Sequence, residues 1–347
     1  MSDFTYPTTN KGFALKLIDD RQASSSQRIE LKEKPLPKLK SGQVLIKMLA
    51  APVNPSDLVY LLGRYGIAPV DSAFVGFEGC GVVVKANAGL YGKWLEGKRV
   101  SLSAVPGLDG VWAEYAITSA NYCLPIRKDI SDEQASTIIV NPLTSICMID
   151  RAIELGAKAV IINAAASQVG KGAIRYAKMK NLKTIATVRS ASNVDVLEKL
   201  GADCVLLTTA DDYKQQLTEA CQRVKPTVLL DAVAALDTPQ ILHAMPKRST
   251  AIVYGRLTEN HDPIGGQFGV SDVIFKNIKI EGFWLANYFA KSKPWHIYAL
   301  SKKVQKLFAE GTFQTDIYGT FNFDTFSSAL DHYANNKSDG KVILKFA

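Results

Sequence analysis

The stretch AVIINAAASQVGKGAIRYAKMKNLKTIATVRS, residues 159–190, decides the fold of this chain. It begins with the apolar run Ala159–Ile162, which has the length and branching of a buried strand. After a turn of small residues, small and apolar side chains recur from Val169 to Ala177 at the spacing of one helix face. A second apolar run, Thr184–Val188, indicates another buried strand. The pattern therefore predicts a βαβ unit of a parallel sheet.

The turn after the first strand suits a phosphate group. Its side chains are small, so the backbone at the helix N-terminus can approach a pyrophosphate, where N–H groups and the helix dipole favour an anion. The full G-x-G-x-x-G fingerprint is absent, and Ser167, Gln168 and Gly170 stand in its place. Small-residue turns of this kind also occur generally in doubly wound domains.

The end of the second strand indicates which dinucleotide such a site would take. Where an NAD(H) site usually has Asp or Glu for the ribose 2′-hydroxyl, this chain has Arg189. A guanidinium at that position would pair with a 2′-phosphate. The sequence therefore predicts NADP(H) as the cofactor, although Arg189 is also one of 41 Lys and Arg residues.

Four further apolar runs continue the alternation of strands and helices. They lie within residues 200–207, 227–231, 251–255 and 278–282. Together with the first two strands they predict an α/β fold, a doubly wound parallel sheet of the Rossmann type from roughly residue 130 to 288.

The remainder of the chain has a different character. Short strands broken by glycine and proline are expected at residues 44–50, 81–85, 98–102 and 112–117, in a β-rich, barrel-like module. Strands at 318–321 and 341–346 indicate that about the last fifty residues pack back on this module. We expect domain bounds of 1–126 with 292–347 for the module and 127–291 for the Rossmann domain, with a cleft between them for substrate and nicotinamide.

Size and composition exclude several classes of protein. The chain has 347 residues, of which 47% are hydrophobic and 21% charged, which predicts about two domains with packed cores. No apolar run approaches the roughly 18 residues of a membrane span. Residues 1–7 show neither a signal peptide nor a transit pattern. We therefore expect a cytoplasmic protein with no membrane partner.

The cysteines, histidines and charges are dispersed. Five cysteines without a C-x-x-C pair indicate reduced thiols. Four histidines lie far from them and from one another, so the sequence predicts no zinc. The net charge is +8, but Lys and Arg form no dominant block, which argues against nucleic acid and suits polyphosphate cofactors or acidic carriers.

Several segments resemble the medium-chain dehydrogenase/reductase superfamily, in its order and spacing over nearly the whole chain. They are Val53–Asp57, Val75–Val83 and Leu200–Asp203. The zinc alcohol dehydrogenases of that superfamily carry a His before the glutamate of the G-x-E-x-x-G segment, and Phe77 stands there in this chain. The resemblance implies a GroES-like catalytic domain of β-barrel type beside the Rossmann domain, without a catalytic metal.

Within the superfamily the chain most resembles the zinc-independent 2-enoyl thioester reductases, of the mitochondrial trans-2-enoyl-CoA reductase type, and next the NADPH quinone oxidoreductases. The segments that carry this likeness are Asn54–Asp57 with Gly63–Gly66, Val140–Thr144, Asn163–Gly170 with Val188 and Arg189, and Gly282–Leu285. The Gly-Arg-Tyr-Gly loop resembles the catalytic tyrosine loop of these reductases. It implies that Tyr65 is catalytic, with its hydroxyl as proton donor.

The resemblance also implies a set of cofactor-binding residues. They are Asn141, Thr144, Ala166, Ser167, Gln168, Val169, Gly170, Arg189, Ser190, Tyr254, Gly255, Phe283, Trp284 and Lys341. Two positions depart from the family pattern, because Gln168 replaces a glycine beside the pyrophosphate and Arg256 replaces a small residue.

A few residues have two interpretations each. Asn54 is a turn former or a group that polarises the substrate. Trp112 is a packing residue or a substrate contact. Asp57 is expected to cap a helix that starts at Ser56 or Asp57, and Glu78 to be a buried structural acid.

The expected function is NADPH-dependent reduction of an activated C=C bond, first of all in a trans-2-enoyl thioester. The alternative within the same class is quinone reduction, and the alternative of another class is an NADPH-binding sensor or RNA-binding protein with little turnover. The lysines from Lys291 to Lys306 form either a solvated face or a dock for an acidic acyl carrier. A homodimer is expected, because Ile278–Leu285 is an apolar edge segment.

Overall fold

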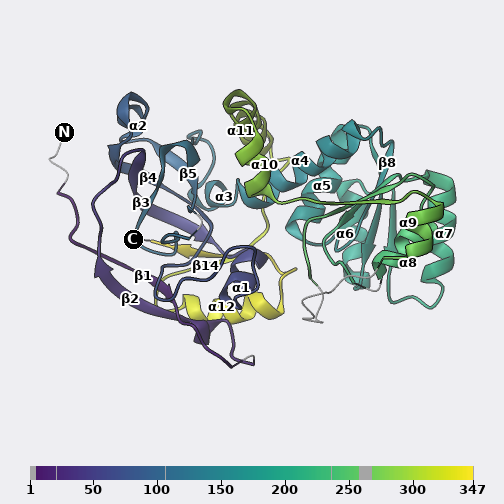
Figure 1. The fold of residues 1–347 in the computed structure, drawn as a ribbon, viewed down its shortest axis with the longest axis horizontal. Coiled ribbons are helices and arrows are strands. Elements are labelled where there is room, and N and C mark those ends of the chain that lie inside the picture. Colours follow the sequence, from purple (N-terminus) through teal and green to yellow (C-terminus); the bar gives the residue numbers. More distant parts are fainter. Residues whose placement is uncertain (1–4, 21, 106, 236, 258–267, 347) are drawn as a thin grey trace. The chain divides into compact units, whose positions relative to one another are not determined.

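The computed structural model describes residues 5–20, 22–105, 107–235, 237–257 and 268–346. The chain divides into two compact units, residues 1–140 with 301–347 and residues 141–300 (Figure 1). Both boundaries lie further along the chain than the expected 126/127 and 291/292. In the described part of the chain, no helix is long and apolar enough to cross a membrane.

The second unit is built on a six-stranded parallel sheet. Its strands are β8 (Ala159–Ile162), β9 (Lys183–Val188), β10 (Cys204–Leu207), β11 (Val228–Asp231), β12 (Thr250–Val253) and β13 (Lys279–Gly282). They are arranged in the order β10-β9-β8-β11-β12-β13. This is the order 3-2-1-4-5-6 of a Rossmann sheet, so the doubly wound fold and its six strands are confirmed.

Helices precede, connect and follow these strands. They are α4 (Val140–Glu154), α5 (Gln168–Met179), α6 (Val194–Leu200), α7 (Tyr213–Val224), α8 (Asp237–Ala244), α9 (Val270–Phe275), α10 (Leu285–Lys291) and α11 (Pro294–Ala309), with a 3-10 turn at Ala191–Asn193. Helices α4 and α11 continue across the two boundaries. The apolar faces of α7 and α8 meet strands β8 and β11 in the core of this unit, where Leu217, Ile241, Ile161 and Leu229 are buried.

The first unit contains a seven-stranded sheet and a separate two-stranded one. The strands are β1 (Thr9–Leu15), β2 (Ile29–Pro35), β3 (Gln43–Pro52), β4 (Glu78–Asn87), β5 (Arg99–Ser103), β6 (Tyr115–Ser119), β7 (Cys123–Pro125), β14 (Ile317–Phe321) and β15 (Lys341–Lys345). The larger sheet runs β14-β15-β3-β4-β5-β7, with β6 also paired to β3, and β1 pairs with β2. The helical segments are α1 (Pro55–Leu61), α2 (Gly89–Leu95), α3 (Asp132–Ser136) and α12 (Phe326–Asn335), with 3-10 turns at Ser26–Arg28 and Ala120–Tyr122.

The end of the chain completes the first unit. Strand β15 pairs antiparallel with β3, where Leu344 lies opposite Ala51, and β14 pairs parallel with β15. The expectation that the last fifty residues pack back on the N-terminal module is therefore confirmed.

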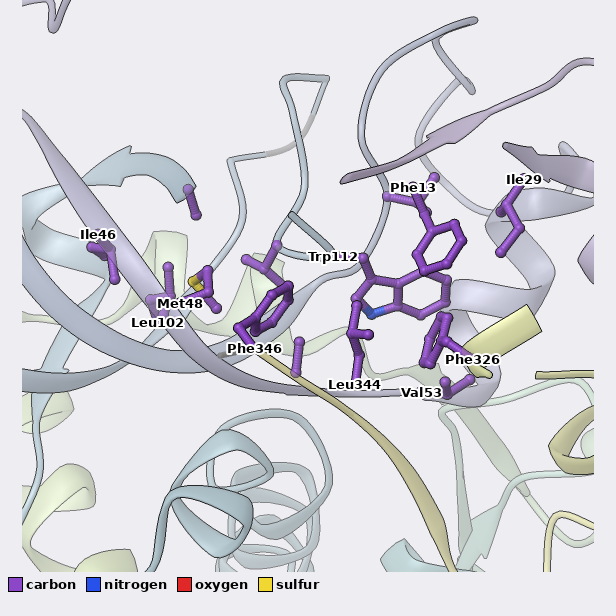
Figure 2. Close-up of a cluster of buried hydrophobic side chains, with 14 of the residues drawn as sticks. Phe13, Ile29, Ile46, Met48, Val53, Leu102, Trp112, Phe326, Leu344 and Phe346 are labelled. Atoms are coloured by element: carbon purple, nitrogen blue, oxygen red, sulfur yellow. The ribbon is translucent and has the colours of Figure 1, made fainter. Parts of the chain in front are cut away.

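One predicted strand needs correction. The run expected at 112–117 becomes strand only from Tyr115, because Trp112 turns into the core. Its Nε1 donates to Pro52 O over 3.1 Å, and its ring meets Phe326 edge-on with centroids 4.9 Å apart (Figure 2). Gly76 makes room for the indole, because it has a φ of +96° and a Cβ there would lie 2.3 Å from the ring. Trp112 is thus enclosed by the first unit's own core, which favours the packing interpretation, and its contact with substrate stays a prediction.

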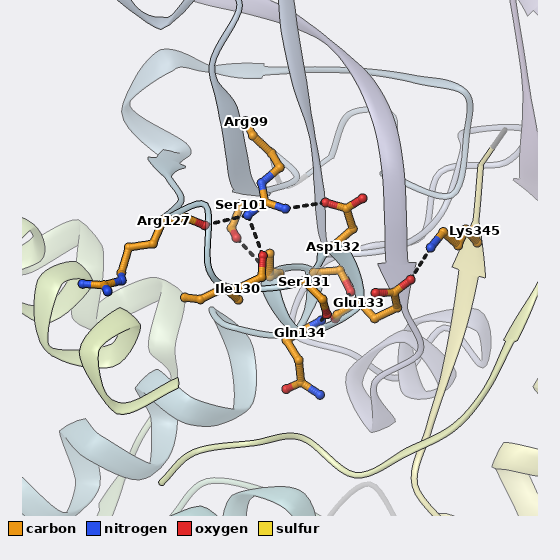
Figure 3. A network of polar contacts seen from close by, with 11 residues as sticks. Arg99, Ser101, Arg127, Ile130, Ser131, Asp132, Glu133, Gln134 and Lys345 are labelled. Atoms are coloured by element: carbon orange, nitrogen blue, oxygen red, sulfur yellow. Dashed lines mark hydrogen bonds and ion pairs between the residues drawn. The ribbon is translucent and has the colours of Figure 1, made fainter. Parts of the chain in front are cut away.

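A polar network explains why residues 127–140 belong to the first unit. Arg99 donates to Asp132 Oδ1 and to the carbonyl of Ile130, each over 2.6 Å (Figure 3). The Ser101 hydroxyl donates to Ala135 O, and Lys345 pairs with Glu133. These contacts hold α3 against β5 and β15, so the boundary falls after α3.

Candidate functional site

The residues expected to bind the cofactor gather at the carboxyl edge of the parallel sheet. Because parallel strands all end at one edge, the segments that follow them meet there. Ala166, Ser167, Gln168, Val169 and Gly170 follow β8, Arg189 and Ser190 follow β9, Tyr254 and Gly255 follow β12, and Phe283 and Trp284 follow β13. The structure thus brings eleven of the fourteen expected cofactor residues to one edge of the second unit.

The turn after β8 is packed closely against the start of α5. Ser167 is the N-cap of α5, and its Oγ accepts the N–H of Gly170 over 3.1 Å. A Cβ on Gly170 would lie 2.5 Å from Ala165 O, so this position requires glycine. Ala164 supplies the left-handed conformation of the turn, with a φ of +44°. Helix α5, which has 12 residues, therefore begins directly after this loop. A phosphate site needs this arrangement, because the N–H groups of the first helical turn bind the anion.

Two further expected cofactor residues, Asn141 and Thr144, come from α4, whose start is tied to that of α5. The Ser145 hydroxyl lies 3.0 Å from Asn141 O and 2.8 Å from Val169 O. Asn141 and Thr144 are nearly buried on the turn of α4 that this contact holds. The side chains at the start of both helices are therefore fixed relative to one another.

A buried polar pair joins the ends of the neighbouring strands β8 and β11, the point where the strand order reverses and where doubly wound sheets form a binding crevice. Asn163 Nδ2 donates to Asp231 Oδ1 over 2.6 Å, and Asn163 Oδ1 accepts the N–H of Ala232 over 2.7 Å. Asp231 also accepts the hydroxyl of Thr238 over 2.8 Å and the N–H of Ala234 over 2.9 Å. Ligands of doubly wound sheets bind at such switch points. The sequence analysis did not identify Asp231, although its place at the end of a buried strand was visible.

The Tyr254 hydroxyl offers an unused donor at this edge. It is buried beside Ser167 and has no hydrogen-bond partner of normal geometry among the described residues. Burial, together with the negative charge of Asp231, raises the pKa of Tyr254 well above its usual range, so the phenol stays protonated. Buried polar groups are rarely left unpaired. A ligand oxygen in the crevice would satisfy this one, so the residues present fit a dinucleotide.

The positions after β9 suit a phosphate monoester. Arg189 is exposed, and its backbone is held by the Thr209 hydroxyl, which donates to Arg189 O over 3.3 Å. The hydroxyls of Ser190 and Ser192 lie 2.8 Å apart beside it. One guanidinium and two hydroxyls at one strand end form a donor set for a 2′-phosphate.

The segment after β13 supplies two half-buried aromatic rings. Phe283 is fixed by its N–H, which donates to Val253 O over 2.8 Å, and Trp284 is the N-cap residue of α10. The Phe283 ring lies 5.8 Å from that of Tyr288. Flat apolar side chains at this end of the sheet can pack against a planar ring.

Tyr65 lies in the loop after α1 of the first unit and is half-buried. Its ring packs on Phe77 with centroids 5.1 Å apart, and Phe77 also meets Tyr60 edge-on at 5.4 Å. Phe77 holds the position that carries a metal-binding His in the zinc alcohol dehydrogenases. Tyr65 therefore sits on an aromatic cluster that provides no metal ligand.

A buried ionic cluster lies at the centre of the first unit. The Lys341 ammonium donates to Asn54 Oδ1 over 2.6 Å, to Val53 O over 2.8 Å and to Tyr333 OH over 3.1 Å. Asn54 Nδ2 donates to Glu78 Oε1 over 2.9 Å. Lys341 is the fourteenth expected cofactor residue, and these contacts take up all three of its N–H donors. Its contact with a cofactor, like the substrate role of Asn54, stays a prediction.

Asp57 belongs to the same cluster, and it is not the N-cap residue of helix α1 that the sequence predicted. Helix α1 begins at Pro55 and Asn54 is its N-cap residue. Asp57 lies at the third helical position, where it accepts the N–H of Asn54 over 2.7 Å and that of Phe77 over 3.0 Å. Asp57 thus reaches back to the cap and joins α1 to the residue under Tyr65.

The cluster shifts the pKa of its members. Burial raises the pKa of Asp57 to about 7. The hydrogen bond from the N–H of Asn54 and the positive charge of Lys341 oppose this rise. Burial also raises the pKa of Glu78, whose Oε2 accepts the N–H groups of Ile139 and Val140. Burial lowers the pKa of Lys341 to about 8. Glu78 is therefore a buried structural acid that anchors the start of α4.

Metal ligands and disulfides are absent from the part of the chain that the structure describes. No group of three His, Cys, Asp or Glu side chains there could hold a metal ion, and His261 lies outside the described residues. None of the five cysteines forms a disulfide, and four of them are buried.

The basic run of the sequence analysis lies on α10 and α11. In the second unit an open pocket of about 420 Å³ is lined by Tyr288, Lys291, Ser292, Lys293, Trp295 and His296. Within it the Tyr288 hydroxyl lies 2.8 Å from His296 Nε2. Lys306 pairs with Glu310 at 3.6 Å, as expected of a solvated face.

Comparison with known protein families gives two matches in sequence. Residues 40–128 match the alcohol dehydrogenase GroES-like domain, and residues 169–306 match the zinc-binding dehydrogenase family. The mitochondrial enoyl-[acyl-carrier-protein] reductase of Dictyostelium discoideum is 30% identical over 286 residues, which are 80% of this chain and 78% of that protein.

Solved structures give the same result. A protein of Mesorhizobium loti assigned as an NADPH:quinone reductase has a TM-score of 0.89 and 32% identity, over 99% of this chain and 100% of that one. Etr1p in complex with NADP and crotonyl-CoA has a TM-score of 0.79 and 21% identity, over 97% and 100%. Its heterodimer with Etr2p, from Candida tropicalis, has a TM-score of 0.80 and 20% identity, over 98% and 100%.

Proposed function

Because this chain belongs to the medium-chain dehydrogenase/reductase superfamily, we propose that it is an NADPH-dependent, zinc-independent reductase of an activated C=C bond. The first substrate proposed is a trans-2-enoyl thioester. The observation that carries the proposal is Tyr65, a half-buried phenol placed on Phe77 where the zinc enzymes have a metal-binding histidine. The relatives named above support this substrate class.

The carboxyl edge of the second unit's sheet would hold NADP(H). Residues at the start of α5 would take the pyrophosphate, and Tyr254 OH would donate to an oxygen of the dinucleotide. Arg189 and Ser190 would bind the 2′-phosphate, and Phe283 with Trp284 would pack on the nicotinamide side. When bound, NADPH supplies the hydride for the β-carbon of the substrate.

The chain itself has to deliver a proton to the α-carbon and stabilise charge on the thioester oxygen. A phenol does either, because its O–H donates a hydrogen bond at neutral pH. The packing of Tyr65 on Phe77 restricts the ring, and the bond from Phe77 N–H to Asp57 fixes the residue beneath it. A donor held in place contributes more to the rate than one that has to be ordered in each turnover.

Quinone reduction is the second candidate. It is favoured by the 32% identity to the Mesorhizobium loti protein over almost the whole chain. Reduction of a quinone protonates oxygen, which water can do, so it would not depend on the Tyr65 hydroxyl. A sensor or RNA-binding role would instead show NADPH binding without turnover of either substrate.

The deciding experiment measures oxidation of NADPH and NADH by the purified chain with crotonyl-CoA and 1,4-benzoquinone in parallel. The proposal expects NADPH-dependent turnover of crotonyl-CoA above that of the quinone. Turnover of the quinone alone would support the second candidate. Binding of NADPH with neither turnover, together with salt-sensitive binding of RNA, would support the third.

The oligomeric state of the chain is part of the same proposal. A homodimer is proposed. Among the described strands, the edge strand β13 pairs with β12 alone and exposes Ile280, and Etr1p forms a heterodimer with Etr2p. The cytoplasmic compartment stays a prediction. The relatives named above include mitochondrial enzymes, and fractionation of cells that express the chain would decide between the two compartments.

A further inference from the structure

Helix α2 presents an apolar face that the described part of the first unit leaves uncovered. The exposed fraction is 89% for Leu90, 54% for Trp94 and 43% for Tyr91. Leu90 and Trp94 lie one helical turn apart, and the Tyr91 ring stacks on the Trp94 ring with centroids 5.7 Å apart. The three side chains therefore form one continuous surface, which single exposed hydrophobic residues do not.

The opposite side of α2 fixes this orientation. Gly92 and Leu95 are buried, and a Cβ on Gly92 would lie 2.7 Å from Ala88 Cβ and 3.1 Å from Ala86 Cβ. The helix therefore lies directly on the end of β4. Leu90 and Trp94 cannot turn inward without separating the helix from the sheet.

Lysines surround the apolar face. Lys98 Nζ lies 4.4 Å from the centre of the Trp94 ring, and Lys93 is exposed on the helix itself. Lys38 and Lys40 are exposed in the loop that Asn87 holds beside α2, through its bond to Leu39 O at 3.1 Å. Helix α2 itself contains no Asp or Glu, and Glu96, its exposed C-cap residue, accepts the N–H of Ala86 over 2.9 Å.

We propose that α2 docks on an anionic lipid surface. Leu90, Tyr91 and Trp94 would enter the boundary between headgroups and acyl chains, and the lysines would pair with the headgroups. Tyr and Trp suit this boundary because each has an apolar body and a polar tip. Figure 1 shows α2 at the outer edge of the first unit. This proposal departs from the expectation of no membrane partner, which rested on the lack of an apolar run long enough to span a membrane. It does not depend on the proposed reaction.

The test is cosedimentation of the purified full chain with phosphatidylcholine vesicles, with and without phosphatidylglycerol. Binding is expected to the mixed vesicles only and to fall at high salt, because exposed charges are screened. The double variant Leu90→Ser with Trp94→Ser should lose binding. Lys93→Gln with Lys98→Gln should weaken it by about thirtyfold, since each lysine near such a surface contributes about a fivefold change in affinity.

The matched control is Trp295→Ser, which removes another exposed tryptophan, in the second unit, and should bind as the unchanged chain does. Thermal melting checks that each variant is folded. Absence of binding to the mixed vesicles, or undiminished binding by the Leu90/Trp94 variant, would overturn the proposal. Dissociation of a dimer by that variant in the absence of vesicles would also overturn it, by assigning the face to a second copy of the chain.

Discussion

Lys341 and Asn54 are 287 residues apart in sequence, and the Lys341 ammonium donates to Asn54 Oδ1 over 2.6 Å. This bond joins the last strand of the chain to the residue that caps α1, just before the Tyr65 loop. Asn54 in turn donates to Glu78, whose other oxygen accepts the N–H groups at the start of α4. One buried chain of contacts within the first unit thus links β15, the cap of α1 and Val140.

The first prediction concerns Tyr65. Tyr65→Phe keeps the ring on Phe77, so the fold and the affinity for NADPH should be retained. Turnover of crotonyl-CoA should fall by about 10²–10⁴-fold, the usual contribution of a general acid. Quinone reduction by the same variant, measured as the control, should fall far less. Full turnover of crotonyl-CoA by Tyr65→Phe would remove the catalytic role.

The second prediction concerns Arg189. Loss of a paired guanidinium–phosphate contact costs about 1.5–3 kcal/mol, so Arg189→Ala should bind NADPH about tenfold to hundredfold more weakly. The affinity for NADH should hardly change, because NADH has no 2′-phosphate. Fluorescence titration with both cofactors measures the two affinities. An equal loss for NADH would show that Arg189 has a structural role instead.

The third prediction concerns pH and the buried cluster. Burial raises the pKa of Asp57 from 3.8 to about 7, so the folded protein binds this proton more tightly than the unfolded chain. Its contribution to stability is complete below about pH 4 and is lost as the pH rises to about 7. The midpoint of thermal unfolding of the unchanged chain, relative to that of Asp57→Asn, should therefore decrease over this interval.

Asp57→Asn keeps the shape of the side chain but cannot titrate, so it is the matched control. A difference in melting temperature that is constant from pH 4 to pH 7 would mean that Asp57 is ionised in the folded protein throughout. Lys341 has the opposite arrangement, because its pKa is lowered to about 8. The contribution of Lys341 to the stability of the folded protein is present above the pKa of a free lysine and is lost as the pH falls to about 8.

The fourth prediction concerns metal. Phe77 replaces the family's histidine, and the described residues contain no cluster of metal ligands. The purified protein should carry zinc far below one atom per chain, and treatment with a chelator should leave its activity unchanged. A zinc alcohol dehydrogenase treated in parallel supplies the positive control. Stoichiometric zinc, with activity lost on chelation, would contradict the prediction.

The fifth prediction concerns assembly. Helix α9, just before the edge strand β13, exposes Ile274 and Phe275, with exposed fractions of 62% and 76%. If a second copy of the chain covers this region, Ile274→Asp with Phe275→Asp should convert a dimer to a monomer at micromolar concentration, as measured by light scattering. A chain that is monomeric without substitution would end the proposal of a homodimer.

The sequence by itself determined the Rossmann sheet and the residues at its carboxyl edge. Its central strands β8 and β11 are short apolar runs that are buried throughout, and such runs are recognisable without knowledge of their neighbours. The resemblance to the reductases named the cofactor residues after β8, β9, β12 and β13, and the parallel order of these strands places them at one edge. The first unit was harder to predict. Its β1–β2 pair was missed, because charged residues alternate through β2 and its burial depends on β1.

Only the tertiary structure decided the contacts between distant residues. Local pattern gives no reason for Lys341 to meet Asn54, for Trp112 to leave the expected strand and pack on Phe326, or for α3 to join the first unit. Each depends on a buried polar group or a large side chain that finds its partner after the sheets have formed. A buried polar group is tolerated only where a partner replaces the water that it loses, and a sequence pattern specifies one partner at a time, not the pair.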